Sequence, residues 1–251
     1  MCTVVLLRRP GHDWPLLMAT NRDERVDRAW DPPARHWLDR KDVIAGRDRE
    51  ANGSWLGMND QRVVAAILNR SGSLGPAPDK RSRGELVLEA LDHAAAADAA
   101  EALSELDTRS YKSFNLIVAD AENAFWIRGE GNGAPTVSEV PEGISIFTAH
   151  DMNDVHASPR TRHYLPLFQS AQPPNPQVGD WAEWEELVAS REMAEGQTDA
   201  NAAIHVETDW GFGTVSTSLI ALPAMTDEDI SPKWRFAEAW PTRKPYRDIL
   251  A

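Results

Sequence analysis

Cys2-Thr3-Val4-Val5-Leu6-Leu7 opens the chain as a strand-forming run, and Cys2 is the only cysteine among the 251 residues. Removal of Met1 would place the Cys2 thiol and a free α-amine on one residue. The amine has an ordinary pKa of about 7.7–8.0 and the thiol of about 8.5, so a neutral amine can accept the thiol proton near neutral pH. The alternative interpretation of Cys2 is a small, buried apolar residue. A nucleophilic cysteine requires partner residues elsewhere in the chain, and their presence or absence distinguishes the two interpretations.

A second strand is expected directly after this run. Residues 3–9 and 15–21 are largely apolar and the Pro10-Gly11 pair between them is typical of a turn, so we expect an antiparallel hairpin. The second strand is expected to end in the polar cluster Asn21-Arg22-Asp23-Glu24. Polar residues at the end of a buried strand often form a functional site. The same residue types also form structural ion networks, and the pattern leaves both interpretations open.

Another hairpin is expected further along the chain. The Asn52-Gly53 pair predicts a turn and residues 55–58 a short strand. Residues 62–69 are rich in β-forming residues and end in the polar Asn69. Residues 25–42, which precede this hairpin, contain two adjacent prolines and lack periodicity, so an irregular loop is expected there.

The rest of the sequence alternates helices with strands. Ser82 with Glu85 predicts a capping box, and Ser158-Pro159 predicts another helix start. Helices are expected at 82–91, at 95–106, from 158 and at 181–193, and strands at 114–119, 123–128, 135–138, 144–148, 214–222 and 234–240. Strands joined by tight turns are antiparallel, and sheets separated by helix pairs indicate an α+β protein. We therefore expect one domain over residues 1–251, with two antiparallel sheets face to face and helices outside.

The charge and the cysteine content narrow the class of protein. The net charge is −13, and residues 120–240 hold six basic against twenty acidic side chains. Such acidity argues against a nucleic-acid partner, which requires a basic surface. One cysteine allows no disulfide within the chain, and no apolar run approaches the roughly 20 residues that span a bilayer. We expect a cytoplasmic protein without a membrane span, acting on or binding a small molecule.

These patterns together resemble the NRDE family, also called the transport and Golgi organization protein 2 family. The matching pieces are Met1-Cys2-Thr3, Asn21-Arg22-Asp23-Glu24, Gly46-Arg47-Asp48, Asn52-Gly53-Ser54-Trp55-Leu56-Gly57, Leu68-Asn69-Arg70 and Gly211-Phe212-Gly213-Thr214. The resemblance is dense over residues 1–70 and thin beyond about residue 150. It implies the four-layer αββα fold of N-terminal nucleophile hydrolases.

A more distant similarity to choloylglycine hydrolases and penicillin V acylases implies roles for four residues. In that comparison Cys2 is the nucleophile, and Arg22 lies beside the sulfur and favours the thiolate. Asn69 donates its side-chain amide to an oxyanion. Asp23 holds the α-ammonium group or orients the amine.

Other residues are expected to contact the substrate, and two positions depart from the relatives. We expect Glu24, Trp55, His150 and Asp151 to line the substrate site. Where the hydrolases carry a further active-site Asn, this chain has Ala149-His150, so His150 either substitutes for it or only lines the site. Where many NRDE sequences have an Arg after Gly-Thr, this chain has Val215.

Two functions from different classes follow. The first is hydrolysis of a linear amide C–N bond in a small molecule by Cys2, without a cofactor. The second is a non-catalytic ligand-binding or haem-trafficking protein, as the resemblance implies. Cys2 or a His would then be an axial haem ligand, flanked by some of the ten tryptophans. The spacing of His150, His156 and His163 is not typical of a metal site, and no metal is expected.

Overall fold

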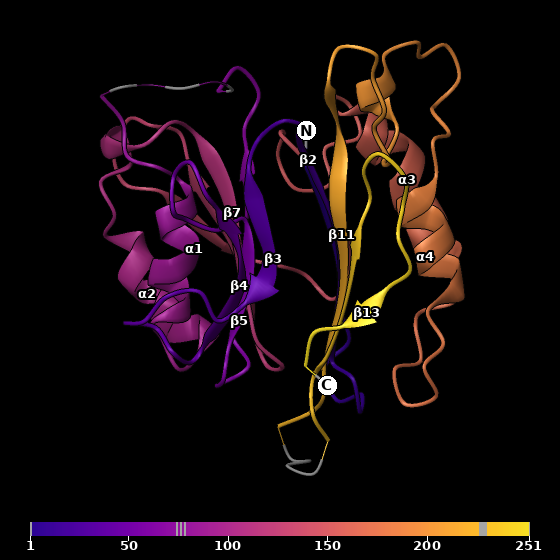
Figure 1. Ribbon diagram of the computed structural model, residues 1–251. Helices are drawn as coiled ribbons and strands as arrows, with labels where there is room; N and C mark the ends of the chain where they lie inside the picture. Colours follow the sequence, from indigo (N-terminus) through magenta and orange to yellow (C-terminus); the bar gives the residue numbers. More distant parts are fainter. Residues whose placement is uncertain (1, 74, 76, 78, 226–229, 251) are drawn as a thin grey trace. The chain divides into compact units, whose positions relative to one another are not determined.

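The computed structural model describes residues 2–73, 75, 77, 79–225 and 230–250. Within them the chain forms two compact units (Figure 1). Unit 1 comprises Met1–Arg28 and Pro141–Ala251, and unit 2 comprises Ala29–Val140. Each unit holds one antiparallel sheet with helices packed on it. The expectation of one domain over residues 1–251 stays a prediction.

The sheet of unit 1 is built around the two strands that open the chain. Its strand order is β10-β1-β2-β11-β12-β13. The bounds are β1 Thr3–Arg8, β2 Leu16–Arg25, β10 Gly143–Phe147, β11 Phe212–Leu222, β12 Lys233–Glu238 and β13 Arg247–Asp248. The hairpin of β1 and β2 is confirmed, with Thr3 opposite Asn21. The two-residue β13 was not expected from the sequence.

The polar cluster lies inside β2 and does not follow it. We expected a strand over residues 15–21 that ends in the cluster, but β2 continues to Arg25. Its second half pairs with the long strand β11, where Gly213 faces Glu24 and Thr217 faces Asn21. β11 is eleven residues long and pairs with β2 along its whole length, so residues 212–216, opposite residues 22–25, extend the sheet beyond Thr3 of β1. This pairing holds the polar residues of β2 in strand conformation.

Helices α3 (Pro159–Ser170) and α4 (Ala182–Ala189) cover one face of this sheet (Figure 1). The expected cap of α3 is confirmed, since Oγ of Ser158 accepts the backbone N–H of Thr161 at 3.1 Å. The α4 helix is shorter than the expected 181–193. Phe168 of α3 packs edge-on against Trp184 of α4, with ring centroids 5.4 Å apart. Both rings are buried against apolar residues of β1, β2 and β11, and each such burial stabilises the fold by about 1.5–3 kcal/mol.

Unit 2 is a meander in which each strand pairs with its neighbours in the sequence. The strand order is β3-β4-β5-β6-β7-β8-β9. The bounds are β3 Trp30–Ala34, β4 Val43–Asp48, β5 Leu56–Asn59, β6 Val64–Asn69, β7 Phe114–Ala119, β8 Ala124–Gly129 and β9 Thr136–Glu139. Helices α1 (Gly84–Leu91) and α2 (Ala96–Ser104) pack on one face of the sheet (Figure 1). A core of Leu, Val, Ala and aromatic side chains fills the space between them.

The expectation of an irregular loop at residues 25–42 is wrong, because this segment contains β3. Proline cannot donate to a strand ladder and is therefore confined to edge strands. Pro32 and Pro33 lie in the edge strand of this sheet, at a register shift between Asp31 and Ala34. Arg47 and Arg49 bind the Asp31 carboxylate, and hydrogen bonds from Arg49 and then Arg47 lower the pKa of Asp31 to about 2. Arg47 thus has a structural role.

The capping box expected at Ser82 does not form. The helix begins at Gly84, and Glu85 pairs with Arg81 at 2.7 Å. The start of α1 is set instead by close contact with the Asn52-Gly53-Ser54 turn, where the N–H of Ser54 donates to the carbonyl of Gly84 at 3.0 Å. A Cβ on Gly84 would lie 2.9 Å from the Ser54 nitrogen, which only glycine avoids. The loop expected at residues 71–79 includes Leu74, Pro76 and Pro78, which lie outside the described residues.

Within the described part of the chain, every helix is too short or too polar to cross a lipid bilayer.

Candidate active site

Cys2 lies at the start of β1, beside the polar half of β2. Its Sγ donates to the backbone carbonyl of Asp23 at a distance of 3.6 Å, and the residue is half-buried. The pairing of Thr3 with Asn21 directs Cys2 toward Arg22 and Asp23. The structure therefore brings three of the expected catalytic residues together within unit 1.

The thiol is held in its protonated form. Burial raises the pKa of Cys2 above its ordinary value, and the negative charge of Asp23 raises it further. Arg22 lowers this pKa, as expected from its charge, but the two raising effects outweigh it. In the chain that carries Met1, Cys2 is thus a poor nucleophile at neutral pH, because the thiolate is the reactive form.

Asp23 is the most deeply buried charge of this region. Its side chain is 0% exposed, and its two carboxylate oxygens have different partners. Oδ2 accepts from Nη1 of Arg160 at 3.0 Å, and Oδ1 accepts from the hydroxyl of Thr214 at 2.7 Å. The backbone carbonyl of Asp23 accepts a hydrogen bond from the Cys2 thiol, and the side chain of Asp23 connects β2 to α3 and β11. Whether the carboxylate also holds an α-ammonium group stays a prediction.

Arg160 was not identified from the sequence. It lies in the first turn of α3 and is 3% exposed. Besides Asp23, its guanidinium donates to the hydroxyl of Thr3 at 2.6 Å and to the carbonyl of Asn201 at 2.9 Å. A cation in the first turn of a helix is unfavourable beside the helix dipole. The position of Arg160 directly after Ser158-Pro159 was therefore a signal that it has an acidic partner.

A β-bulge at Val215 shapes the other side of Asp23. Thr214 is opposite Asp23 and Ser216 is opposite Arg22, so Val215 is an extra residue in β11. A bulge re-aims neighbouring side chains, and in this strand the hydroxyl of Thr214 reaches Asp23. Val215 itself is buried. This chain therefore has an apolar residue at the position where many NRDE sequences have Arg. The cation that pairs with the Asp23 carboxylate is Arg160, which belongs to α3.

Arg22 and Glu24 form an ion pair that extends away from Asp23. Arg22 is 4% exposed, and its guanidinium lies 3.9 Å from the carboxylate of Glu24. The same carboxylate lies 3.7 Å from Arg28 and accepts the backbone N–H of Arg25 at 2.9 Å. Glu24 therefore has structural partners, and its contact with a substrate stays a prediction.

His150 and Asp151 follow β10 at the edge of the unit 1 sheet. Phe147 is opposite Val4, so the chain leaves β10 at the same end of the sheet as Cys2. Both side chains are half-buried, and the N–H of His150 donates to Thr148 at 3.4 Å. Their role in substrate binding stays a prediction.

Asn69 and Trp55 belong to unit 2. Asn69 is half-buried at the end of β6, opposite Phe114. Trp55 packs edge-on against Trp30 with centroids 5.7 Å apart, and a Cβ on Gly46 would overlap its ring. These contacts give Trp55 a structural role within its unit. The expected roles of Asn69 as an oxyanion donor and of Trp55 in substrate binding stay predictions.

No group of three His, Cys, Asp or Glu side chains in the described ranges is arranged to hold a metal ion.

Three solved structures of hydrolases and acylases have a fold similar to that of this chain. Penicillin V acylase from Agrobacterium tumefaciens is 14% identical with a TM-score of 0.57, covering 99% of this chain and 86% of its own. A mutant conjugated bile acid hydrolase from Clostridium perfringens is 13% identical with a TM-score of 0.54, covering 100% and 93%. A Caenorhabditis elegans N-acylethanolamine-hydrolyzing acid amidase ortholog is 12% identical with a TM-score of 0.52, covering 87% and 92%. The expected fold class is thereby confirmed.

The chain belongs to the Transport and Golgi organisation 2 family, whose sequence model matches residues 1–225. The mouse Transport and Golgi organization 2 homolog is 35% identical to it over 112 residues. That alignment covers 42% of this chain and 38% of the mouse protein. The resemblance drawn from the sequence is confirmed.

Replacing Arg160 with Met is expected to lower the free energy of unfolding by about 3–5 kcal/mol, because it leaves the buried Asp23 carboxylate without its cation. Urea denaturation measures the change. Arg162→Met is the matched control, because Arg162 is exposed on the same helix, and it should change stability by less than about 0.5 kcal/mol. Equal losses in the two variants would contradict the structural role of Arg160.

The pH dependence of iodoacetamide labelling tests the charges around the thiol. In the chain that carries Met1, the midpoint should lie above the ordinary thiol pKa of about 8.5, since burial and Asp23 both disfavour the thiolate. Asp23→Asn should move the midpoint to lower pH and Arg22→Gln to higher pH. Intact mass verifies that Met1 is present. A midpoint at or below the ordinary value, or shifts of the opposite sign, would refute this description of the site.

Proposed function

We propose that this protein is a hydrolase in which Cys2 attacks a linear amide bond of a small molecule. The observation that carries the proposal is the 3.6 Å hydrogen bond from the Cys2 thiol to the backbone carbonyl of Asp23, a residue whose buried carboxylate accepts a hydrogen bond at each oxygen. Such a support holds a nucleophile on rigid strands. The fold shared with an acylase, a bile acid hydrolase and an acid amidase supports a reaction of this class.

In the proposed reaction, removal of Met1 exposes the α-amine of Cys2 as the base. The amine takes the thiol proton, and the sulfur attacks the carbonyl carbon of the amide. The C–N bond breaks as the ammonium group returns the proton to the departing amine. Water then attacks the thioester and releases the carboxylic acid and the thiol. One amide and one water thus give one acid and one amine.

The raised pKa of Cys2 explains why this base is needed. With Met1 in place, the thiol is protonated at neutral pH and lacks an adjacent amine of its own. After processing, the amine of the same residue, with an ordinary pKa of about 7.7–8.0, accepts that proton locally. We propose that Asn69 donates to the oxyanion and that Glu24, Trp55, His150 and Asp151 contribute to substrate binding.

Incubation of the processed protein with a library of N-acyl amides tests the proposal. The processed form should cleave at least one amide, whereas Cys2→Ala should cleave none. A form with Gly-Ser added before Cys2 keeps the thiol but moves the amine, and it should lose at least about 100-fold in rate, the usual contribution of a positioned base. Intact mass confirms each N-terminus.

The result against the proposal is an absence of turnover together with thiol labelling no faster than that of free cysteine. The alternative ligand-binding function is tested by adding haem to the same preparations and measuring the Soret absorbance. A Soret shift without amide cleavage would favour a haem-binding protein, and loss of that shift in Cys2→Ala would identify Cys2 as the ligand.

A further inference from the structure

Three hydroxyl groups on the unit 1 sheet are buried without a hydrogen-bond partner. Thr20 is 7% exposed, and Ser216 and Ser218 are each 2% exposed. Within the part of the chain that the structure describes, none of these three hydroxyl groups is hydrogen-bonded. Unlike the indole nitrogen of Trp184, which is unpaired and fully enclosed, the three oxygens keep some area accessible to solvent. A buried hydroxyl without a partner costs free energy that a bound group can recover.

The hydroxyl cluster, Thr20, Ser216 and Ser218, shares one face of the sheet with Arg22. Thr20 is opposite Ser218, and Arg22 is opposite Ser216. Residues directly opposite each other in an antiparallel pair point to the same face, and so do residues two apart in one strand. The four side chains therefore form a compact array on β2 and β11.

The other face of the same two strands, on which α3 and α4 pack, has its polar side chains paired. Thr217 donates to the side chain of Asn21 at 2.8 Å, and Thr214 donates to Asp23 at 2.7 Å. Hydroxyl groups on these strands are thus satisfied where the sheet meets its helices. The unpaired ones gather on the opposite face, which is expected of a binding surface and not of a packed core.

Cys2 points to the same face as the hydroxyl cluster. Its neighbour Thr3 accepts a hydrogen bond from Arg160 of α3, and successive residues of a strand point to opposite faces. Thr3 is opposite Asn21, so Cys2 lies beside Arg22 at a corner of the array. With strands about 4.8 Å apart and a rise of about 3.3 Å per residue, the backbone of the cluster lies about 8–12 Å from that of Cys2.

The chemistry of the hydroxyl cluster fits a carboxylate. Each hydroxyl group has a proton to donate, and an ionised carboxylate is a pure acceptor with about four lone-pair sites. Arg22 supplies positive charge on the same face. Arg22 and Arg28 both lie near the carboxylate of Glu24, and these two cations and one anion leave a local net charge of +1. This charge favours an anion over an ammonium group.

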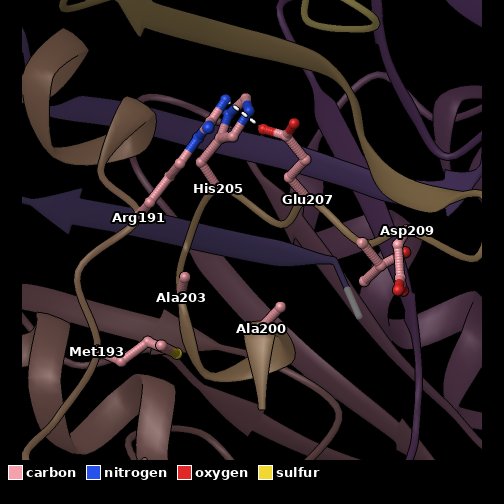
Figure 2. Close-up of a pocket in the computed structure, with 8 residues that line it drawn as sticks. Arg191, Met193, Ala200, Ala203, His205, Glu207 and Asp209 are labelled. Carbon is pink, nitrogen blue, oxygen red and sulfur yellow. Dashed lines mark ion pairs between the residues drawn. The ribbon is translucent and has the colours of Figure 1, made fainter. Parts of the chain in front are cut away.

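The hydroxyl cluster is separate from the pocket shown in Figure 2. That pocket has a volume of about 380 Å³ and is lined by residues between Arg191 and Asp209, none of which belongs to the cluster. Its ion pair of Arg191 and Glu207 is exposed. Exposed ion pairs contribute little to binding, so the buried hydroxyl groups are the stronger basis for selecting a ligand.

We propose that the hydroxyl cluster binds a carboxylate at the far end of the acyl chain of the substrate. This assignment rests on the proposed hydrolysis and names its substrate class, the monoamides of dicarboxylic acids. The acyl part stays attached to Cys2 in the thioester while the amine leaves, so contacts with the acyl part act in both steps. An adipyl chain extends about 6 Å, and contacts of about 3 Å at each end complete the distance from Cys2 to the cluster.

Calorimetric titration of the Cys2→Ala protein with adipic acid monoamide measures this binding without turnover. The monoamide should bind at least about tenfold more tightly than hexanamide or 6-hydroxyhexanamide, in which a methyl group or an alcohol replaces the carboxylate. Ser218→Ala and Thr20→Val, each made in the Cys2→Ala protein, should each weaken binding of the monoamide about tenfold, as expected for a lost hydrogen bond to a charged group.

Urea denaturation of the same variants separates binding from a structural role. Because the hydroxyl groups of Thr20 and Ser218 are unpaired, their removal should leave the urea midpoint unchanged or raise it. Ser170→Ala removes an exposed hydroxyl group at the end of α3, and as the matched control it should change the affinity less than about twofold.

Equal affinities for the monoamide and hexanamide, or for the monoamide and 6-hydroxyhexanamide, would overturn the proposal. So would unchanged affinity in both hydroxyl variants, or a lowered urea midpoint that accounts for their loss of binding. Tight binding of the monoamide without amide turnover in the processed protein would refute the hydrolysis and support the carboxylate site. Turnover without a preference for the monoamide would refute the carboxylate site alone.

Discussion

The buried carboxylate of Asp23 is the constraint on which the site of this protein depends. An ionised group without exposure to water is tolerated only when it is paired and hydrogen-bonded. Arg160 and Thr214 meet this requirement from α3 and β11. Because Arg160 also binds Thr3, the same charge pair joins β1, β2, β11 and α3 at the end of the sheet where Cys2 lies. A one-residue slip of β2 would turn Asp23 to the opposite face and break all of these contacts.

This arrangement gives Cys2 two opposite properties. The rigid strands hold its sulfur against the backbone of Asp23, which suits a nucleophile, while burial and the Asp23 charge keep the thiol protonated. The conflict disappears in the proposed function if the base is the α-amine of Cys2, which is free only after Met1 is removed. Met1 lies outside the described residues, and the chemistry proposed for this site therefore depends on one peptide bond at the start of the chain.

Local patterns predicted much of the fold. The apolar runs of β1 and β7 and the cap at Ser158 were recognisable because a continuous run of β-forming residues and a capping residue are both local patterns. The polar half of β2 was expected to end the strand, because only pairing with the distant strand β11 continues it to Arg25. The edge strand β3 was missed because its two prolines are typical of loops. Residue types at the site were therefore easier to predict than the strand conformation that positions them.

The site itself was predictable only in part, because contacts between residues far apart in the sequence leave little trace in local patterns. Cys2, Arg22 and Asp23 were identified from the predicted hairpin and from the resemblance to known hydrolases. Arg160 is 137 residues from Asp23 in the sequence, and Ser216 and Ser218 reach the residues of β2 only through the pairing of β11. Their roles come from tertiary contacts, although the cation in the first turn of α3 was a usable signal. Val215 was noted as a departure from the family, and the structure shows that it is the extra residue of a β-bulge.

A double-mutant cycle on Asp23 and Arg160 tests most directly whether the two side chains act as one unit. The free energy of unfolding is measured by urea denaturation for wild type, Asp23→Asn, Arg160→Met and the double variant. The buried pair predicts that the double variant loses less stability than the sum of the single losses, with a coupling of at least about 1 kcal/mol. Additive losses would mean that the two residues stabilise the protein independently, and would contradict the central role of the Asp23 carboxylate.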